Sequence, residues 1–349
     1  MIVYIAEQGS QLHKTGERLS VIKEGIVLRW FHTKDIQQII IMGSISLTSP
    51  VITYLLKEKI DTVFMSYFGK YRGRLVGEFG KNIALRVSQY GYLSIPDKCK
   101  VLAKIYILGK IENQIYMMQR RNYRIKSNEV IKSLTILRHL SKQIKEGDDN
   151  LESLRGYEGS AARVYFSVFS HFLLIDDFIF NGRNRRPPKD EINALLSLAY
   201  TFLMNQIQTK LYECGLDPYY GALHQLSYGR QSLALDIMEE FRPLVDDFVL
   251  SMINKKIIRK NHFKYNSNLN DSADGEIEGN LPVMLTPDGM RKFIFQFQEF
   301  LKTNYFYFDK DGKYKLSYIF LLQCQSMARV LKDSELDYKS FNWKINVLN

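Results

Sequence analysis

Short apolar runs, broken by polar turns, dominate the first 80 or so residues of the chain. Runs of this length that end at glycine-containing turns are typical of strands, so the N-terminal region is predicted to be β-rich. One segment differs, because Val51–Glu58 has the spacing of a helix and follows Pro50, which the first turn of a helix tolerates. The predicted strands are Ile2–Ala6, Gln11–Lys14, Leu19–Lys23, Ile26–Phe31, Ile36–Met42, Thr62–Ser66 and Tyr71–Glu78.

The spacing of the apolar positions changes after Gly80 and becomes that of a helix, as in Val101–Arg120. Asp97 follows Pro96 and is expected to cap the start of this helix. The remaining predicted helices are Val130–Ile144, Leu151–Phe178, Ile192–Cys214, Ser232–Asn254, Thr286–Leu301 and Tyr314–Leu331.

These two patterns predict an α+β protein with two domains, and a chain of 349 residues is long enough for both. We expect a β-rich domain at residues 1–85 and a larger α-helical domain at residues 86–349. Asn266–Asn280 is polar, rich in asparagine and acidic, and so it is expected to be a mobile loop.

The formal net charge of +11 suits a polyanionic partner, either nucleic acid or an anionic membrane surface. No run of about 18 apolar residues occurs, so no membrane-spanning helix is expected. The N-terminus lacks the basic region of a signal peptide, and we therefore expect a cytoplasmic protein. Three widely spaced cysteines without a CxxC pair indicate neither a disulfide framework nor a thiolate zinc site.

The segment Asp217–Pro243 contains the most informative polar residues. Asp236 and Glu239 are three residues apart and would share one face of a helix whose other residues are mainly apolar. A carboxylate in such surroundings is costly unless it is paired or binds a metal. Arg242 could pair with one of the acids, which is the structural alternative to a catalytic role. Glu240 is expected to face solvent.

A second segment, Leu154–Phe166, contains Glu158 followed by the small residues Gly159-Ser160-Ala161-Ala162. Small residues let helices approach closely, so Glu158 could lie against the helix that carries Asp236. The alternative is a glutamate favoured by the helix dipole near a helix N-terminus. With His224, these carboxylates form a donor set that suits Mg²⁺, which prefers oxygen ligands, or Mn²⁺, which also accepts imidazole.

These segments together resemble the CRISPR-associated integrase, the catalytic protein of spacer acquisition. The resemblance extends over nearly the whole chain and rests on runs that occur in a fixed order. They are GRL at Gly73–Leu75, EGSAAR at Glu158–Arg163, DPYYGALH at Asp217–His224 and SLALDIMEEFRP at Ser232–Pro243.

The resemblance implies a metal-dependent enzyme that joins the 3′-hydroxyl ends of a short DNA duplex to a CRISPR repeat. It further implies an N-terminal β-domain through which the chain forms a homodimer, and a small ferredoxin-like partner protein. In the family pattern Glu158, His224 and Asp236 match the catalytic metal ligands. Glu239 matches a further acidic position, whose direct binding to Mg²⁺ or Mn²⁺ is left open.

Basic clusters recur in the helical part and could bind the phosphates of double-stranded DNA. The alternative for any one cluster is a solvated helix face or loop. Arg163 and Arg230 lie close in sequence to the metal candidates and could contact the scissile phosphate or balance the acids. The clusters are Arg120, Arg121, Arg124 and Lys126, then Arg183, Arg185, Arg186 and Lys189, and finally Lys255, Lys256, Arg259, Lys260 and Lys264.

Three hypotheses follow for the function. The leading one is the integrase, which would cut as an endonuclease when water replaces the 3′-hydroxyl. The second is a nuclease that cleaves branched DNA or RNA in repair. The third is a non-catalytic DNA-binding subunit, against which the intact Glu158, His224 and Asp236 argue.

Overall fold

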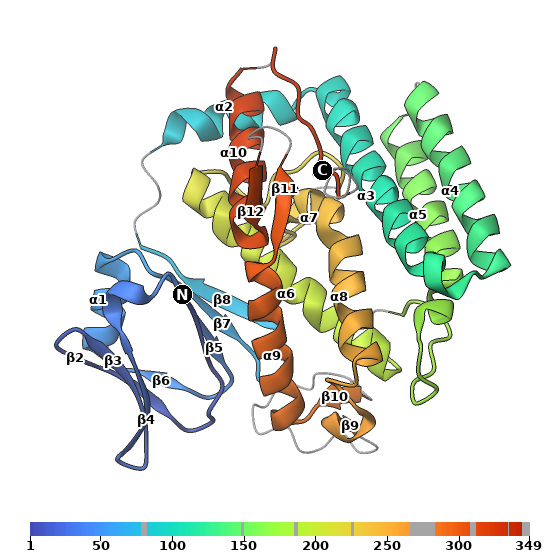
Figure 1. Ribbon diagram of the computed structural model, residues 1–349. Helices are drawn as coiled ribbons and strands as arrows, with labels where there is room; N and C mark the ends of the chain where they lie inside the picture. Colours follow the sequence, from blue (N-terminus) through green and yellow to red (C-terminus); the bar gives the residue numbers. More distant parts are fainter. Residues whose placement is uncertain are drawn as a thin grey trace. The chain divides into compact units, whose positions relative to one another are not determined.

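The computed structural model describes residues 1–77, 82–147, 150–184, 188–224, 227–265, 283–307, 312–333 and 335–343. The chain divides into two units, Met1–Gly80 and Lys81–Asn349, of which the first contains most of the strands and the second is mainly helical (Figure 1). The predicted α+β fold class is confirmed. The expected loop at 266–280 lies outside the described residues.

Two sheets, one α-helix and a short 3₁₀ helix at Thr33–Asp35 make up the regular structure in the described part of the first unit. One sheet has the order β1-β5-β7-β8, in which β1, β5 and β7 are parallel and β8 is antiparallel to β7. The other has the order β4-β3-β2-β6. The strands are β1 (Ile2–Ile5), β2 (Gln11–Thr15), β3 (Arg18–Lys23), β4 (Ile26–His32), β5 (Gln38–Met42), β6 (Ser46–Leu47), β7 (Asp61–Met65) and β8 (Tyr71–Leu75).

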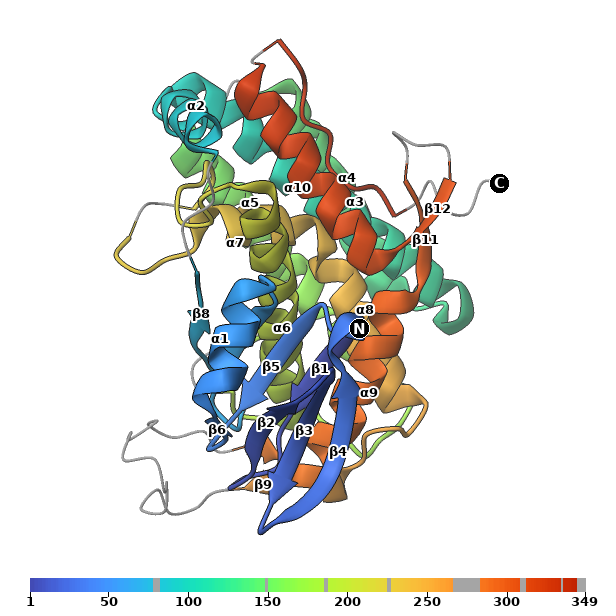
Figure 2. The same cartoon turned by 90° about the vertical axis from the view of Figure 1, so that its left-hand side faces the viewer.

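The core of this unit joins side chains from both sheets and from helix α1 (Ser49–Lys57). Val51 and Leu55 of α1 pack in one cluster with Ile39 and Ile41 of β5, and with Leu12 of β2. Strand β5 is buried along its whole length, as the apolar run Ile39–Met42 after Gln38 favours. By contrast, β4 lies at an edge of its sheet (Figure 2). Most of its side chains are exposed.

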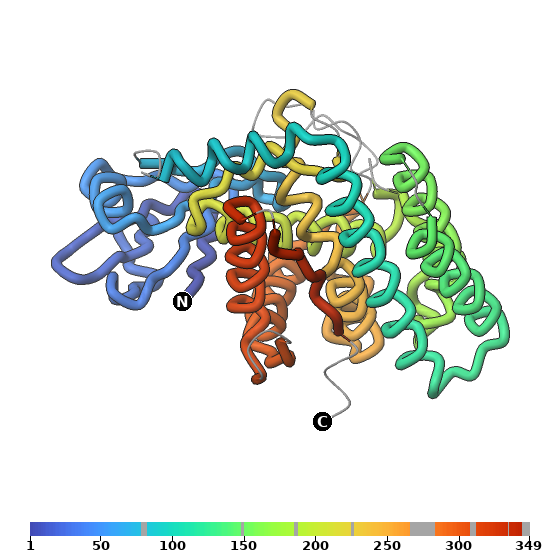
Figure 3. The backbone as a smooth tube through the Cα atoms, turned by 90° about the horizontal axis from the view of Figure 1, so that it is seen from above, coloured from blue at the N-terminus to red at the C-terminus, as the bar shows by residue number. Residues whose placement is uncertain are grey.

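The second unit is built around helix α3 (Pro96–Ile125), which contacts α4 (Asn128–Glu146) and α5 (Leu151–Ser167). Figures 1 and 3 show these three helices side by side. Helix α6 (Glu191–Cys214) contacts α7, α8 and α10. The other α-helices of this unit in the described residues are α2 (Ile83–Leu93), α7 (Ser232–Met238), α8 (Arg242–Asn254), α9 (Pro287–Lys302) and α10 (Leu316–Lys332). Its strands form two antiparallel pairs, β9 (Phe263–Tyr265) with β10 (Val283–Leu285) and β11 (Asn304–Tyr307) with β12 (Gly312–Lys315).

The helix predicted at Leu151–Phe178 is wrong in its second half, because α5 ends at Ser167. A short 3₁₀ turn follows at Phe169–Phe172, and the chain then folds back. The ring of Phe180 packs 5.1 Å from that of Phe169, so the apolar sequence after Ser167 forms an aromatic cluster rather than one face of a helix.

Proline accounts for two further differences from the predicted elements: a helical segment with the expected bounds is interrupted, and one helix has a different N-cap. The predicted helix Ser232–Asn254 is divided into α7, a 3₁₀ turn at Glu239–Phe241 and α8, because Pro243 has no N–H to continue the hydrogen-bond ladder and instead stands at the start of α8. The N-cap of α3 is Ile95 rather than Asp97, since Pro96 occupies the first turn. In the described part of the chain, no helix is long and apolar enough to cross a membrane.

Candidate active site around Glu158, His224 and Glu239

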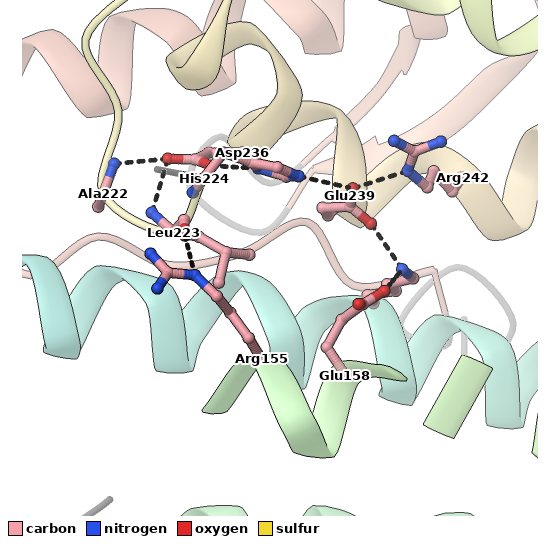
Figure 4. Close-up of polar contacts among 9 residues, drawn as sticks. Arg155, Glu158, Ala222, Leu223, His224, Asp236, Glu239 and Arg242 are labelled. Carbon is pink, nitrogen blue, oxygen red and sulfur yellow. Dashed lines mark hydrogen bonds and ion pairs between the residues drawn. The ribbon is translucent and has the colours of Figure 1, made fainter. Parts of the chain in front are cut away.

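The Asp236 side chain, on α7, holds the loop before this helix through hydrogen bonds. It is completely buried and accepts hydrogen bonds from the backbone N–H groups of Ala222 at 2.6 Å, Leu223 at 3.0 Å and His224 at 3.0 Å. The His224 ring contributes a fourth hydrogen bond, from Nδ1 to Oδ1 at 2.7 Å (Figure 4). Both oxygens of Asp236 are therefore used in holding the loop and the imidazole.

Gly221 explains why this loop can approach the helix so closely. A Cβ atom at position 221 would lie 2.5 Å from Oδ2 of Asp236 and 2.6 Å from the carbonyl carbon of Ser232. No side chain fits at those distances, so glycine is required here for a close approach. At the base of the same loop, Gln89 of α2 donates to the carbonyl oxygens of Asp217 at 2.8 Å and Tyr220 at 3.1 Å.

The hydrogen bond to Asp236 fixes the tautomer of His224. Because a carboxylate can only accept, Nδ1 of His224 carries the proton and Nε2 keeps its lone pair when the ring is neutral. Nε2 lies 4.0 Å from Oε1 of Glu239. This arrangement, in which a carboxylate orients the imidazole through the other nitrogen, is typical of histidines that bind metals.

Glu239 lies at the turn between α7 and α8, and its carboxylate is almost fully buried between two cations. Oε1 accepts from Nε of Arg242 at 2.8 Å, and Oε2 pairs with Nζ of Lys110 at 2.7 Å. Burial alone would raise the pKa of Glu239, but the charges of Arg242 and Lys110 outweigh it and hold this pKa well below its usual range. Glu239 is therefore a carboxylate throughout the ordinary pH range.

Lys110 joins Glu239 to Glu158. Its ammonium projects from α3, forms an ion pair with Oε1 of Glu158 on α5, and pairs with Glu239 at the same time. Lys110 is only 5% exposed. Burial lowers the pKa of Lys110, but the two carboxylates raise it more, and the side chain is charged.

The site residues expected from the sequence thus separate into two roles. Glu158, Glu239 and Nε2 of His224 point toward a common region, whereas the oxygens of Asp236 are turned to the loop (Figure 4). Within the described residues, no three His, Cys, Asp or Glu side chains are close enough to hold a metal ion as they stand. Two carboxylates converging on one ammonium, with an imidazole beside them, nevertheless form a donor set of the kind that Mg²⁺ or Mn²⁺ accepts.

Glu240 does not face solvent as expected, because the C-terminal segment covers it. Its buried carboxylate accepts from the Tyr338 hydroxyl at 2.6 Å, the Phe341 N–H at 2.7 Å and Nε2 of Gln323 at 2.7 Å. Burial raises the pKa of Glu240 to about 7. Asn113 of α3 donates to the carbonyl oxygens of Glu240 at 2.8 Å and Phe341 at 2.9 Å, so this turn is attached to α3.

The expected DNA-binding residues differ in their surroundings. The Arg183 guanidinium is used in contacts within the second unit. It donates to Oδ1 of Asn193 at 2.7 Å and lies over the ring of Tyr200. Arg185 and Arg186 lie outside the described residues. Exposed positions are occupied by Arg163, Arg230, Lys255, Lys256, Arg259 and Lys260.

Two residues of the site were missed from the sequence. Arg155 lies one turn before Glu158 and donates from Nε to the carbonyl oxygen of Leu223 at 2.8 Å. Lys110 was the other. It follows Tyr106 and Ile107 at helical spacing and so falls on the buried face of α3. A lysine on such a face requires an acidic partner, and that signal could have identified it.

The sequence is similar to a known family and to several of its members. The family model described as CRISPR associated protein Cas1 matches residues 3–299. CRISPR-associated endonuclease Cas1 3 from Thermus thermophilus is 36% identical over 265 residues, which cover 75% of this chain and 77% of the relative. CRISPR-associated endonuclease Cas1 1 from Chlorobaculum tepidum is 30% identical over 349 residues, with 98% of each chain covered.

The fold is also similar to solved structures. A casposase bound to integration product matches with a TM-score of 0.81 at 22% identity, over 98% of this chain and 93% of the casposase. A CAS1 protein from Thermotoga maritima matches with a TM-score of 0.78 at 22% identity, over 95% and 97% of the two chains. A chain of a Cas6-RT-Cas1–Cas2 complex gives a TM-score of 0.82 at 24% identity, over 98% of this chain and 36% of that one.

Proposed function

This chain belongs to the CRISPR-associated Cas1 family, and we propose that it is a metal-dependent DNA integrase and endonuclease that inserts short duplexes into a CRISPR array. The observation that carries the proposal is the convergence of Glu158, His224 and Glu239 in a chain whose relatives are named endonucleases. The fold shared with a casposase bound to integration product is consistent with joining as well as cutting.

We assign the metal ligands to Glu158, Nε2 of His224 and Glu239. Asp236, which matches a ligand in the family pattern, has both oxygens occupied by four N–H donors, and so we give it the role of orienting His224. A bound Mg²⁺ or Mn²⁺ would supply charge stabilisation at the scissile phosphate. Arg242 keeps Glu239 ionised, and Arg155 helps to hold the loop that carries His224.

The proposed reaction is a displacement at phosphorus. The oxygen of a DNA 3′-hydroxyl forms a new bond to the phosphorus of the target strand and releases its proton. The bond from phosphorus to the target's own 3′ oxygen breaks, and that oxygen takes up a proton to become a new 3′-hydroxyl. With water in place of the hydroxyl, the same displacement hydrolyses the strand, which accounts for an endonuclease activity.

Double-stranded DNA is the proposed substrate, as protospacer and as CRISPR repeat. The net charge of +11 favours a polyanion, and exposed basic side chains in the second unit are available for phosphate contacts. Those we propose for this role are Arg163, Arg230, Lys255, Lys256, Arg259 and Lys260.

Two protein partners are also proposed. Strand β4 exposes Ile26, Val27, Leu28 and Trp30, an apolar edge on the first unit that would suit a homodimer contact through this unit. A small ferredoxin-like protein is the second partner. The shared fold with a chain from a Cas6-RT-Cas1–Cas2 complex supports an assembly with such a protein.

The experiment is a strand-transfer assay with a short duplex and a supercoiled plasmid that carries a CRISPR repeat, in Mg²⁺ or Mn²⁺, with and without the small partner protein. Wild type should join the duplex to the repeat, and Glu239→Gln should reduce the joining roughly a hundredfold or more, because it removes a metal ligand. Cleavage of branched DNA by wild type, with no joining in any condition, would instead support the repair nuclease.

A further inference from the structure

Lys110 occupies an unusual position for a lysine. Its ammonium is buried between two carboxylates that come from different segments, Glu158 on α5 and Glu239 on the turn after α7. These are two of the three groups to which we assign the metal. A single positive charge from the chain itself therefore lies where the carboxylates converge.

We propose that Lys110 is a tethered counter-ion that stabilises the metal-free site and that a divalent cation must displace to bind. The inference rests on the proposed metal site and concerns how that site is loaded. An ammonium and a divalent cation repel each other, so both cannot lie between the same two carboxylates. The affinity for the metal is then lower than the carboxylates and the imidazole alone would give.

The backbone around the site indicates which part has to move. Asn113, one turn further along α3 than Lys110, donates to the carbonyl oxygen of Glu240 at 2.8 Å and so ties α3 to the turn that carries Glu239. Glu239 is also held by Arg242 at 2.8 Å. By contrast, the lysine ammonium stands on a flexible four-carbon stem with three donors that can turn to other acceptors. Exchange therefore requires a side-chain movement of Lys110 and leaves the helices in place.

The counter-ion also explains how the acidic site remains stable without metal. Two carboxylates brought together without a cation would repel each other, and burial of Glu239 would make its charge more costly. The ion pairs to Lys110 offset that cost, together with the hydrogen bond from Arg242 to Glu239. A variant without this ammonium should be less stable when metal-free and should gain more from a metal.

The test is calorimetric titration of the full chain with Mn²⁺, using wild type and Lys110→Met. Displacing the lysine breaks charge-assisted hydrogen bonds, so the neutral variant should bind Mn²⁺ roughly tenfold to a hundredfold more tightly. Lys110→Arg keeps the charge and should bind no more tightly than wild type. Lys104→Met is the matched control, because Lys104 lies on the same helix but donates to the carbonyl oxygens of Lys145 and Gly147.

Thermal unfolding provides a second measurement that does not depend on enzyme activity. In EDTA, the midpoint for Lys110→Met should fall below that of wild type, and saturating Mn²⁺ should raise it by a larger step than in wild type. If Lys110→Met does not fold, Lys110→Gln takes its place, since it keeps a hydrogen-bond donor and removes the charge.

The outcomes separate the inference from the function on which it rests. Equal or weaker Mn²⁺ binding by the folded neutral variant, with Mn²⁺ binding abolished in Glu239→Gln, would overturn the counter-ion role and leave the metal site intact. If neither wild type nor the neutral variant binds Mn²⁺, or if Glu239→Gln binds it as well as wild type, the proposed metal site itself fails. Tighter binding that is specific to the loss of charge at position 110 supports the proposal.

Discussion

Replacing Asp236 with asparagine tests whether this residue orients His224 or binds the metal directly. The aspartate accepts four N–H donors, from the backbone of Ala222, Leu223 and His224 and from Nδ1 of the His224 ring. Asparagine has one carbonyl oxygen, which can accept two of these hydrogen bonds, and an amide group that can only donate. Two of the four donors therefore lose their acceptor in the variant.

The expected cost follows from this count of donors. A buried donor left without a partner costs about 1–3 kcal/mol, so two would cost about 2–6 kcal/mol. The His224 side chain is 19% exposed and its ring can reach water, which places the expected loss in the lower half of that range. Loss of the carboxylate that orients a histidine ligand typically lowers metal affinity about tenfold to a hundredfold. Mn²⁺ binding should thus be weakened and not abolished.

Two measurements on Asp236→Asn give the answer. Unfolding in urea, followed through the buried Trp343, gives the stability of the second unit, and calorimetry gives the affinity for Mn²⁺. The control is Glu239→Gln, which should abolish Mn²⁺ binding. The reasoning is refuted if Asp236→Asn is as stable as wild type. It is also refuted if Asp236→Asn loses all Mn²⁺ binding while Glu239→Gln retains it, because Asp236 would then be the ligand.

Two further predictions concern other parts of the molecule. The buried Asp246 accepts from the hydroxyls of Tyr165 and Tyr200, and burial raises its pKa to about 6, above that of the unfolded chain. The stability that this group contributes is complete below about pH 4 and is lost as the pH rises through 6. In urea titrations the free energy of unfolding of wild type should therefore fall between pH 5 and pH 8, and Asp246→Asn should remove about 1 kcal/mol of that fall. Parallel pH profiles for variant and wild type would contradict this. Trp30→Ser on β4 should shift the protein from dimer to monomer in sedimentation, whereas Tyr123→Ser, at another exposed aromatic, should not; a dimer that persists in Trp30→Ser would count against the proposed contact.

The parts of the fold that could be predicted were those set by local periodicity. The buried strand β5 and the helix α6 have patterns that their neighbours do not alter. The helix predicted through Phe178 was wrong because the same run of aromatic residues suits one face of a helix and the core of a folded-back loop. Only the packing of Phe169 against Phe180 distinguishes the two. Gly221 lies in the run Asp217–His224, on which the family resemblance partly rests. The reason why glycine is needed there, the close approach to Asp236, depends on tertiary structure.

The candidate site was predicted as a set of residues but not as an arrangement. Two acids three positions apart in one helix pattern gave no indication of which would face the site. Which acid faces the site depends on the loop before α7, whose backbone N–H groups donate to Asp236. It also depends on Arg242 and Lys110, which pair with Glu239. Lys110 lies 48 positions before Glu158, and no local pattern links the two. Non-local ion pairs of this kind are found only once the helices are placed.

The most direct test of the integrase claim is to compare donor duplexes that end in a 3′-hydroxyl with otherwise identical duplexes that end in a 3′-deoxy nucleotide. In Mg²⁺ or Mn²⁺ with a repeat-bearing plasmid, wild type should give junctions in which the donor 3′ end is bonded to the target strand, and sequencing should locate them at the repeat. The deoxy donor should give none, and Glu239→Gln should reduce their number roughly a hundredfold or more. Target strands cut equally with both donors, without junctions, would show hydrolysis alone and contradict the account.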